Sequence, residues 1–152
     1  DIGAYPGGWA QIASKIITTG KILSVDIKKM DELKNVSFLQ CDFFEEKTKE
    51  KILNFFKDKL DVVISDMAAN TTGNKSLDSI RTNQLCAEVL EFSSKILKPN
   101  GVLVSKLFMG DDFLEVKELA KSRFKKVDFF KPESSRNESK ETYLHCVTLR
   151  TL

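Results

Sequence analysis

The sequence predicts an α/β fold whose sheet is mainly parallel and ends in an antiparallel hairpin. Short apolar runs alternate with segments whose apolar residues recur at helical spacing, which is the pattern of βαβ units. The last two apolar runs have no helical segment between them, so we expect them to pair as a hairpin. The chain has 152 residues, of which 41% are hydrophobic and 30% charged, so we expect one globular domain over residues 1–152.

The expected elements follow one another along the whole chain. Apolar residues at helical spacing predict helices over residues 7–18, 47–57, 77–97 and 111–124. Short apolar runs predict strands over residues 21–25, 36–40, 60–65, 102–108, 127–131 and 143–150. Between the third helix and the fourth strand, the Pro-Asn-Gly segment at 99–101 predicts a turn.

Charge and cysteine content exclude several classes of protein. A net charge of +2 excludes a polycationic nucleic-acid-binding arm. Cys41, Cys86 and Cys146 are odd in number, far apart and without CxxC spacing, which argues against a disulfide framework or a zinc site and favours a reducing compartment. The single histidine, His145, argues against a catalytic triad or a multi-histidine site, so we expect no metal. No apolar run reaches the roughly 18 residues of a membrane-spanning helix.

Polar residues stand at five successive strand ends. In open α/β sheets, ligands bind beyond the carboxyl ends of the strands, so these positions are candidates for a site. They are occupied by Asp1, Asp26, Asp42, Asp66 and Lys106. One such aspartate alone is most often a helix cap or a turn residue. Four carboxylates and a lysine together indicate one shared site.

A glycine-rich turn follows the first of these strand ends, Asp1. The segment DIGAYPGGW places Gly3 and Gly7 just before a helix, and glycine allows a ligand to approach the backbone closely. The spacing is not the dinucleotide pattern G-x-G-x-x-G, because position 5 is a tyrosine, so a dinucleotide-dependent oxidoreductase is disfavoured. Asp26 is placed to bind ribose hydroxyls, and Asp42 to accept an exocyclic amine. These features predict an adenosine site without a diphosphate, with S-adenosylmethionine (SAM) as the candidate ligand; an ordinary strand-helix turn is the alternative.

Six segments resemble, in order and with similar spacing, the motifs of a known family. They are DIGAYPGGW, SVDIKKMD, FLQCDF, SDMAAN, VSKLFMG and KPESSRNESKETYL. The family is FtsJ (RrmJ/RlmE), the large-subunit ribosomal RNA 2′-O-ribose methyltransferases, and the resemblance covers essentially the whole chain. It implies a Rossmann-like methyltransferase fold, SAM as cofactor, and methylation of a ribose 2′-hydroxyl, that of a uridine, in large-subunit ribosomal RNA. Ala69, where proline is usual, and Tyr5, where a small residue is usual, depart from the family pattern.

The resemblance also implies the catalytic and cofactor-binding residues. The family's catalytic set is Lys-Asp-Lys-Glu, and Asp66, Lys106 and Glu141 match its last three members. The first lysine precedes the first strand in the family. Because this chain opens at the end of that strand, we expect most of the strand and this lysine to lie upstream in a longer parent protein. The implied cofactor-binding residues are Asp1, Gly3, Gly7, Trp9, Asp26, Asp42 and Asp66.

Two catalytic roles for Lys106 are open. A ribose 2′-hydroxyl is a poor nucleophile, so a nearby group must take or orient its proton while the oxygen attacks the methyl carbon in line. A neutral Lys106 could take the proton, which would require its amine to lose its charge. A protonated Lys106 could instead steer the hydroxyl. The leaving sulfonium is already activated, so the reaction needs no metal.

The implied partner is ribosomal RNA or the large ribosomal subunit. Lys131, Arg136 and Lys140 are the candidate RNA-binding residues, because they adjoin Glu141 in the sequence. We expect a monomer in the cytoplasm, with an organellar or nuclear location left open. A transfer-RNA or messenger-RNA-cap ribose methyltransferase is one alternative, and a catalytically inactive RNA-binding relative is another.

Overall fold

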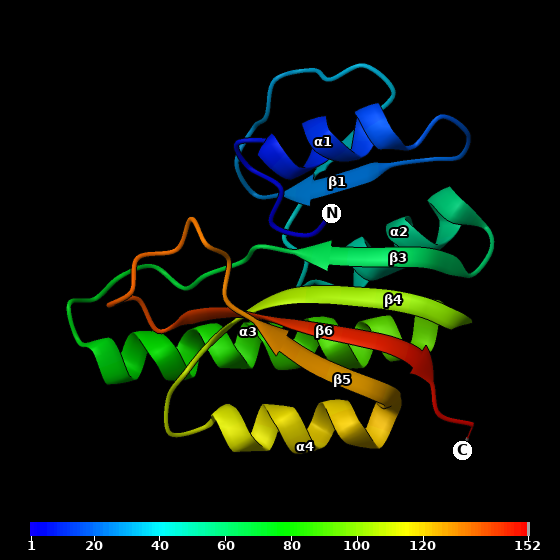
Figure 1. Cartoon of the computed structure of the whole chain (residues 1–152). Coiled ribbons are helices and arrows are strands. Elements are labelled where there is room, and N and C mark those ends of the chain that lie inside the picture. The colour runs from blue at the N-terminus through cyan, green and yellow to red at the C-terminus, as the bar shows by residue number, and fades with distance from the viewer. Residues whose placement is uncertain (152) are drawn as a thin grey trace. The chain divides into compact units, whose positions relative to one another are not determined.

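The computed structural model describes residues 1–151 of the chain (Figure 1). Its helices are α1 (Gly8–Ile16), α2 (Glu46–Phe56), α3 (Lys75–Ile96) and α4 (Phe113–Arg123). Its strands are β1 (Leu23–Asp26), β2 (Ser37–Gln40), β3 (Leu60–Ser65), β4 (Leu97–Phe108), β5 (Phe124–Phe130) and β6 (Glu141–Leu149). All the predicted helices and strands are present. The described chain forms two compact units, residues 1–59 and the residues from 60 onward.

The first unit contains a parallel pair of strands and two helices. Strands β1 and β2 pair from Leu23 and Ser37 onward. Ile2 forms an isolated parallel bridge with Val25, and the Val25 amide donates a 2.9 Å hydrogen bond to the Asp1 carbonyl. Residues 1–3 therefore run alongside β1 before the chain enters the glycine-rich turn and α1. The buried apolar residues of this unit include Ile2, Ala10, Leu23, Val25, Met30, Phe43 and Ile52.

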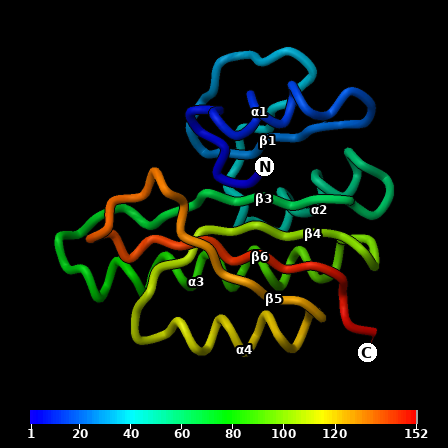
Figure 2. The backbone as a smooth tube through the Cα atoms, viewed as in Figure 1, coloured from blue at the N-terminus to red at the C-terminus, as the bar shows by residue number. Residues whose placement is uncertain are grey.

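The second unit is a four-stranded mixed sheet in the order β3-β4-β6-β5. Strands β3 and β4 are parallel, and β6 is antiparallel to both β4 and β5. The predicted antiparallel pairing of the last two strands is confirmed, but β6 also lies between β4 and β5 (Figure 2). Helices α3 and α4 cover one face of this sheet (Figure 1). The core beneath them includes Leu103, Leu107, Leu144 and Cys146, all fully buried.

The prediction of a turn at residues 99–101, between the third helix and the fourth strand, is wrong. Residues 99–101 lie within β4, and α3 passes into this strand without a loop. The ladder is irregular there, because Leu60 pairs with Leu97 while Val62 pairs with Val102. A Cβ on the glycine of this segment would lie 2.9 Å from a backbone oxygen. The Pro-Asn-Gly sequence therefore lies at a shift of register inside a strand, where proline and glycine are tolerated.

None of the helices in the described part of the chain has the length and apolar character needed to cross a membrane.

Candidate active site

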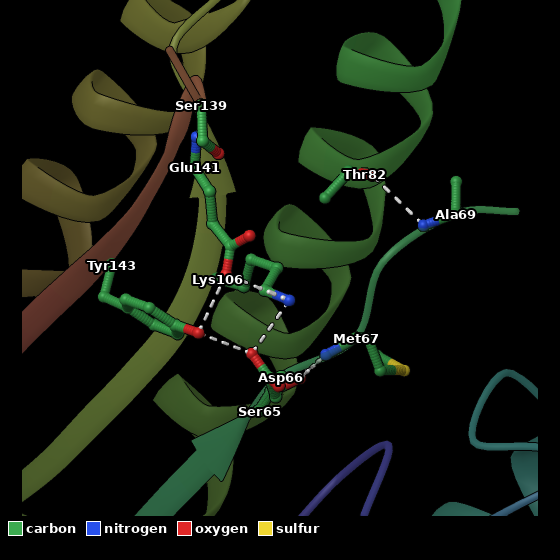
Figure 3. A network of polar contacts seen from close by, with 9 residues as sticks. All are labelled: Ser65, Asp66, Met67, Ala69, Thr82, Lys106, Ser139, Glu141 and Tyr143. Atoms are coloured by element: carbon green, nitrogen blue, oxygen red, sulfur yellow. Dashed lines mark hydrogen bonds and ion pairs between the residues drawn. The ribbon is translucent and has the colours of Figure 1, made fainter. Parts of the chain in front are cut away.

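A lysine and two carboxylates meet in the second unit (Figure 3). The Nζ atom of Lys106 lies 3.0 Å from Asp66 Oδ1 and 3.2 Å from Glu141 Oε1. The Lys106 side chain is 12% exposed, whereas those of Asp66 and Glu141 are 35% and 30% exposed. The three residues that match the family's catalytic motif thus form one cluster, and the lysine is the most buried of the three.

The strand register explains why these residues meet. Asp66 directly follows β3, and the parallel pairing of β3 with β4 aligns the two strands up to Ser65 and Ser105. The next residue on β4 is Lys106. Because β6 runs antiparallel to β4, its first residue, Glu141, pairs with Phe108 near the end of β4. Three segments far apart in sequence therefore meet at the same end of the strands.

Tyr143 is a fourth member of this cluster, and no motif in the sequence singled it out. Its hydroxyl donates hydrogen bonds to Asp66 Oδ1 (2.7 Å) and Glu141 Oε1 (3.1 Å). Burial raises the pKa of this hydroxyl well above its ordinary value, and the hydrogen bond to Asp66 and its charge raise it further. Tyr143 therefore stays a neutral donor. Its position two residues after Glu141 on a strand, which puts both on one face, was the available signal.

The loop after β3 is held by polar side chains of α3. The Ala69 amide donates to Thr82 Oγ1 at 3.1 Å, a contact drawn in Figure 3. The hydroxyl and the amide of Thr72 both donate to Asp78 Oδ1, at 2.7 and 2.9 Å. These hydrogen bonds lower the pKa of the Asp78 carboxyl. The polar residues on the buried side of α3 thus fix the segment that begins with Asp66.

Asn83, also on α3, fixes the segment that follows Lys106. Its side chain is fully buried. The amide nitrogen donates to the Phe108 carbonyl (2.9 Å) and to Asp112 Oδ1 (2.8 Å), and the amide oxygen accepts from the Phe108 amide (2.8 Å). A buried amide with its hydrogen bonds satisfied specifies one arrangement of the end of β4. No pattern in the sequence marked this residue.

Six of the seven predicted cofactor-binding residues belong to the first unit, and Asp66 belongs to the second. Asp26 ends β1, and its carboxylate accepts hydrogen bonds from the amides of Tyr5 (2.9 Å) and Lys28 (2.8 Å). It therefore ties the glycine-rich turn to the end of the strand. Asp42 follows β2, and its Oδ1 accepts from the Phe44 amide at 2.9 Å. Both carboxylates lie at strand ends, as the sequence predicts.

The glycine-rich turn combines two glycines of positive φ with a buried carboxylate that has no partner among the described residues. Gly7 caps α1 with a φ of 114°, and an added Cβ would come within 3.1 Å of Met30 Sδ. Gly3 also has a positive φ of 73°. Trp9 is half-buried in the first turn of α1. Both carboxylate oxygens of Asp1 are buried without a hydrogen-bond partner among the described residues. Such a buried acceptor pair suits donors on a bound ligand, so these residues fit SAM.

The three predicted RNA-binding residues differ in their surroundings. The Lys131 ammonium donates to the carbonyl oxygens of Asn137 (3.3 Å) and Ser139, and so closes the loop over residues 132–140. Arg136 and Lys140 are exposed on the same loop region. Lys131 therefore has a structural role in addition to its charge.

Cys86, Cys146 and His145, which the sequence left without a proposed role in the site, lie in the second unit. Burial raises the pKa of the Cys86 and Cys146 thiols, to about 11 and about 12. His145 lies on β6, paired with Val104 and Asp128 of the neighbouring strands. Among residues 1–151, no group of three or more histidine, cysteine and acidic side chains could hold a metal ion.

The chain is similar to known methyltransferases along nearly its whole length. The model of the FtsJ-like methyltransferase family matches residues 1–149. Two curated relatives are named ribosomal RNA large subunit methyltransferase E. The relative from Pelagibacter ubique is 46% identical, with 99% of this chain and 74% of the relative covered. The relative from Rickettsia akari is 48% identical, with 95% of this chain and 66% of the relative covered. The chain thus spans about two thirds to three quarters of their length.

Solved structures agree with this relationship. A ribosomal RNA methyltransferase from Plasmodium falciparum has a TM-score of 0.87 and 28% identity, with 98% of this chain and 84% of that chain covered. Human methyltransferase-like protein 13, solved in complex with SAH, has a TM-score of 0.69 and covers 97% of this chain and 69% of its own. Its 16% identity supports the fold alone. The predicted α/β methyltransferase fold is confirmed, and the chain belongs to the FtsJ-like methyltransferase family.

Proposed function

We propose that this chain transfers a methyl group from SAM to a ribose 2′-hydroxyl, that of a uridine, in large-subunit ribosomal RNA. The observation that carries the proposal is Lys106 held between Asp66 and Glu141, in a chain of the FtsJ-like family. The names of the curated relatives support ribosomal RNA as the substrate class. The 2′-oxygen and the uridine come from the family resemblance.

The first unit supplies most of the residues proposed to hold the cofactor. Asp26 would bind its ribose hydroxyls and Asp42 its adenine amine. The unpartnered carboxylate of Asp1 would accept from further donors, and Gly3 and Gly7 would let the backbone approach. When bound, the cofactor supplies a methyl group on a sulfonium, which leaves without help from a metal.

The second unit supplies the residues proposed to act on the ribose. Two carboxylate oxygens within 3.2 Å of Nζ form an ion pair with an ammonium, which favours the steering role of Lys106 over the neutral-base role. The ammonium would orient the hydroxyl oxygen and stabilise the charge it develops. Asp66 or Glu141 would receive the hydroxyl proton. Tyr143 holds both carboxylates in place through its two hydrogen bonds.

The RNA is proposed to lie along the loop over residues 132–140, where Arg136 and Lys140 are exposed. Neutralising one phosphate-binding side chain should flatten the dependence of the logarithm of affinity on the logarithm of salt by about 0.7 to 0.9. We further propose that the protein acts as a monomer in the cytoplasm, on ribosomal RNA or the large subunit.

Substitution of Lys106 tests the proposed reaction. Lys106→Ala should lower the single-turnover methylation rate of ribosomal RNA by about 10² to 10⁴, the usual contribution of a positioned proton-transfer or charged group. SAM affinity should change little, since the lysine contacts the ribose in this scheme. Lys106→Arg separates the two roles: a guanidinium keeps the charge but cannot act as a base. Partial activity of Lys106→Arg would support steering, and activity as low as that of alanine would support the base role.

Lys98 offers a matched control on the same strand. The Lys98 ammonium lies 2.8 Å from Asp61 Oδ1, and both side chains are more exposed than those of Lys106, Asp66 and Glu141. Lys98→Ala should therefore leave the methylation rate unchanged. Equal rates for Lys106→Ala and the unchanged protein would contradict the proposed function, as would methylation at a base rather than at a ribose.

A further inference from the structure

One row of side chains crosses the whole sheet of the second unit. Lys106 on β4 pairs with Tyr143 on β6, and Tyr143 pairs with Phe130 at the end of β5. Directly paired residues in a sheet point to the same face. Asp66 follows the last paired residue of β3 and extends the row on the other side of Lys106. The proposed catalytic cluster therefore continues, on one face of the sheet, to an aromatic side chain.

Phe130 differs from the other members of the row in being apolar and exposed. Its ring is stacked on that of Tyr143, with centroids 5.6 Å apart and planes at 23°. Tyr143 is 8% exposed, whereas Phe130 is 47% exposed. The core of the sheet lies on the opposite face, where Leu107, the neighbour of Lys106, is fully buried. Phe130 therefore adds little to this core, and its exposure needs another explanation.

We propose that Phe130 stacks against a nucleobase of the RNA substrate, either the base of the target nucleotide or that of its neighbour. This inference rests on the proposed function. Neighbouring strands are about 4.8 Å apart, so Phe130 lies two strands, or about 10 Å, from Lys106. A target nucleotide whose 2′-hydroxyl lies at Lys106 could span this separation, either alone or together with its neighbour. Aromatic side chains beside single-stranded RNA commonly stack on its bases.

The charges near Phe130 fit a nucleic acid but are too few to bind one alone. Residues 131–140 contain three basic and two acidic residues, which gives a net charge of +1. Phosphate attraction on this loop is therefore modest, and stacking would supply the missing affinity. The stacked Tyr143 ring supports Phe130 from one side and joins it to the groups proposed to act on the ribose.

The test compares two RNA ligands, one that carries bases and one that carries none. The first is a fluorescent twelve-residue oligouridylate, and the second is the same ribose-phosphate chain made abasic. Binding of both is measured by fluorescence anisotropy at one salt concentration. Phe130→Ala should raise the Kd for oligouridylate about 5- to 100-fold, the usual effect of losing one base-aromatic stack. The Kd for the abasic chain should stay within about twofold, because it has no base to stack.

Two further variants control for folding and for loss of apolar surface. Phe130→Trp keeps an aromatic ring and should bind oligouridylate at least as tightly as the unchanged chain. Leu114→Ala removes an apolar side chain of α4 that is 64% exposed, and it should bind both ligands normally. A fold defect in Phe130→Ala would weaken both ligands equally.

The outcomes separate this inference from the proposed function. If the unchanged chain binds oligouridylate and Phe130→Ala binds it equally well, the stacking proposal is wrong while the methyltransferase function stands. An exposed ring used as a protein contact would give this result. If Phe130→Ala weakens both ligands equally, Phe130→Trp decides: a folded Phe130→Trp that has lost oligouridylate binding would contradict the stacking proposal. If the full-length protein binds neither ligand and methylates no ribosomal RNA, the proposed function fails and this inference fails with it.

Discussion

Replacing Tyr143 by phenylalanine removes two hydrogen bonds but keeps the buried ring. These bonds join the hydroxyl to Asp66 (2.7 Å) and Glu141 (3.1 Å). A hydrogen bond to a charged group contributes about 1.5–3 kcal/mol to stability. Both carboxylates are about one-third exposed and keep Lys106 as a partner, so water can replace much of this contribution. We therefore expect the free energy of unfolding to fall by about 1–2 kcal/mol in total.

Thermal and denaturant unfolding measure this effect. A loss of about 1–2 kcal/mol should lower Tm by about 2–8 °C for a chain of this size. If the carboxylates also need Tyr143 to stay in place, the methylation rate should fall in the same variant while SAM affinity stays unchanged. Tyr5→Phe is the matched control, since Tyr5 is 49% exposed and its substitution leaves the cluster intact.

The same variant tests the direction of the pKa shift. The folded state raises the pKa of Tyr143 above the ordinary value of about 10, so the unfolded chain loses this proton at lower pH than the folded chain. The resulting stability is fully present below about pH 10 and is lost as pH rises further. The stability difference between the unchanged protein and Tyr143→Phe should therefore stay constant up to about pH 10 and shrink as pH rises above that value. Equal stability of the two proteins at neutral pH would refute the reasoning.

Three other predictions concern the cofactor, the thiols and the loop after β3. Asp42→Ala should weaken SAM binding by about 1–3 kcal/mol in calorimetry, and an unchanged affinity would rule out the adenine contact. At pH 8, a thiol reagent should modify half-buried Cys41 first, because burial and a raised pKa protect Cys86 and Cys146 until the protein unfolds. The lowered pKa of Asp78 contributes stability above about pH 4 that is lost as pH falls, and acid unfolding of Asp78→Asn should lack this component.

The order of helices and strands could be predicted because it depends on local patterns. Apolar periodicity identified every element, and the strand-end rule identified Asp26, Asp66 and Lys106 as candidates. The position of β6 between β4 and β5 could not be predicted, because the sequence of a strand does not reveal which two strands will pair with it. The segment at 99–101 was misread because Pro-Asn-Gly ordinarily favours a turn, whereas here it lies inside a strand at a shift of register.

The missed residues act through contacts between distant parts of the chain. Tyr143 and Asp66 are 77 residues apart, and Asn83 is 25 residues from Phe108. In the sequence, Tyr143 looks like an ordinary strand aromatic and Asn83 like a polar residue on a helix. Only the packed sheet and helix give these side chains their partners. The family resemblance singled out Glu141 as a candidate, which no local pattern in the sequence did.

The place of β6 has a consequence for the order of events during synthesis. Strands β4 and β5 do not pair with each other, and β6, which is made after both, joins them. A nascent chain that has reached β5 therefore holds the β3-β4 pair and an unpaired β5, and it lacks both Glu141 and Tyr143. The sheet and the cluster of Asp66, Lys106, Glu141 and Tyr143 are completed in the same late step, when β6 leaves the ribosome. Interrupted synthesis would then yield an inert, protease-sensitive product, and no partly active enzyme would accumulate.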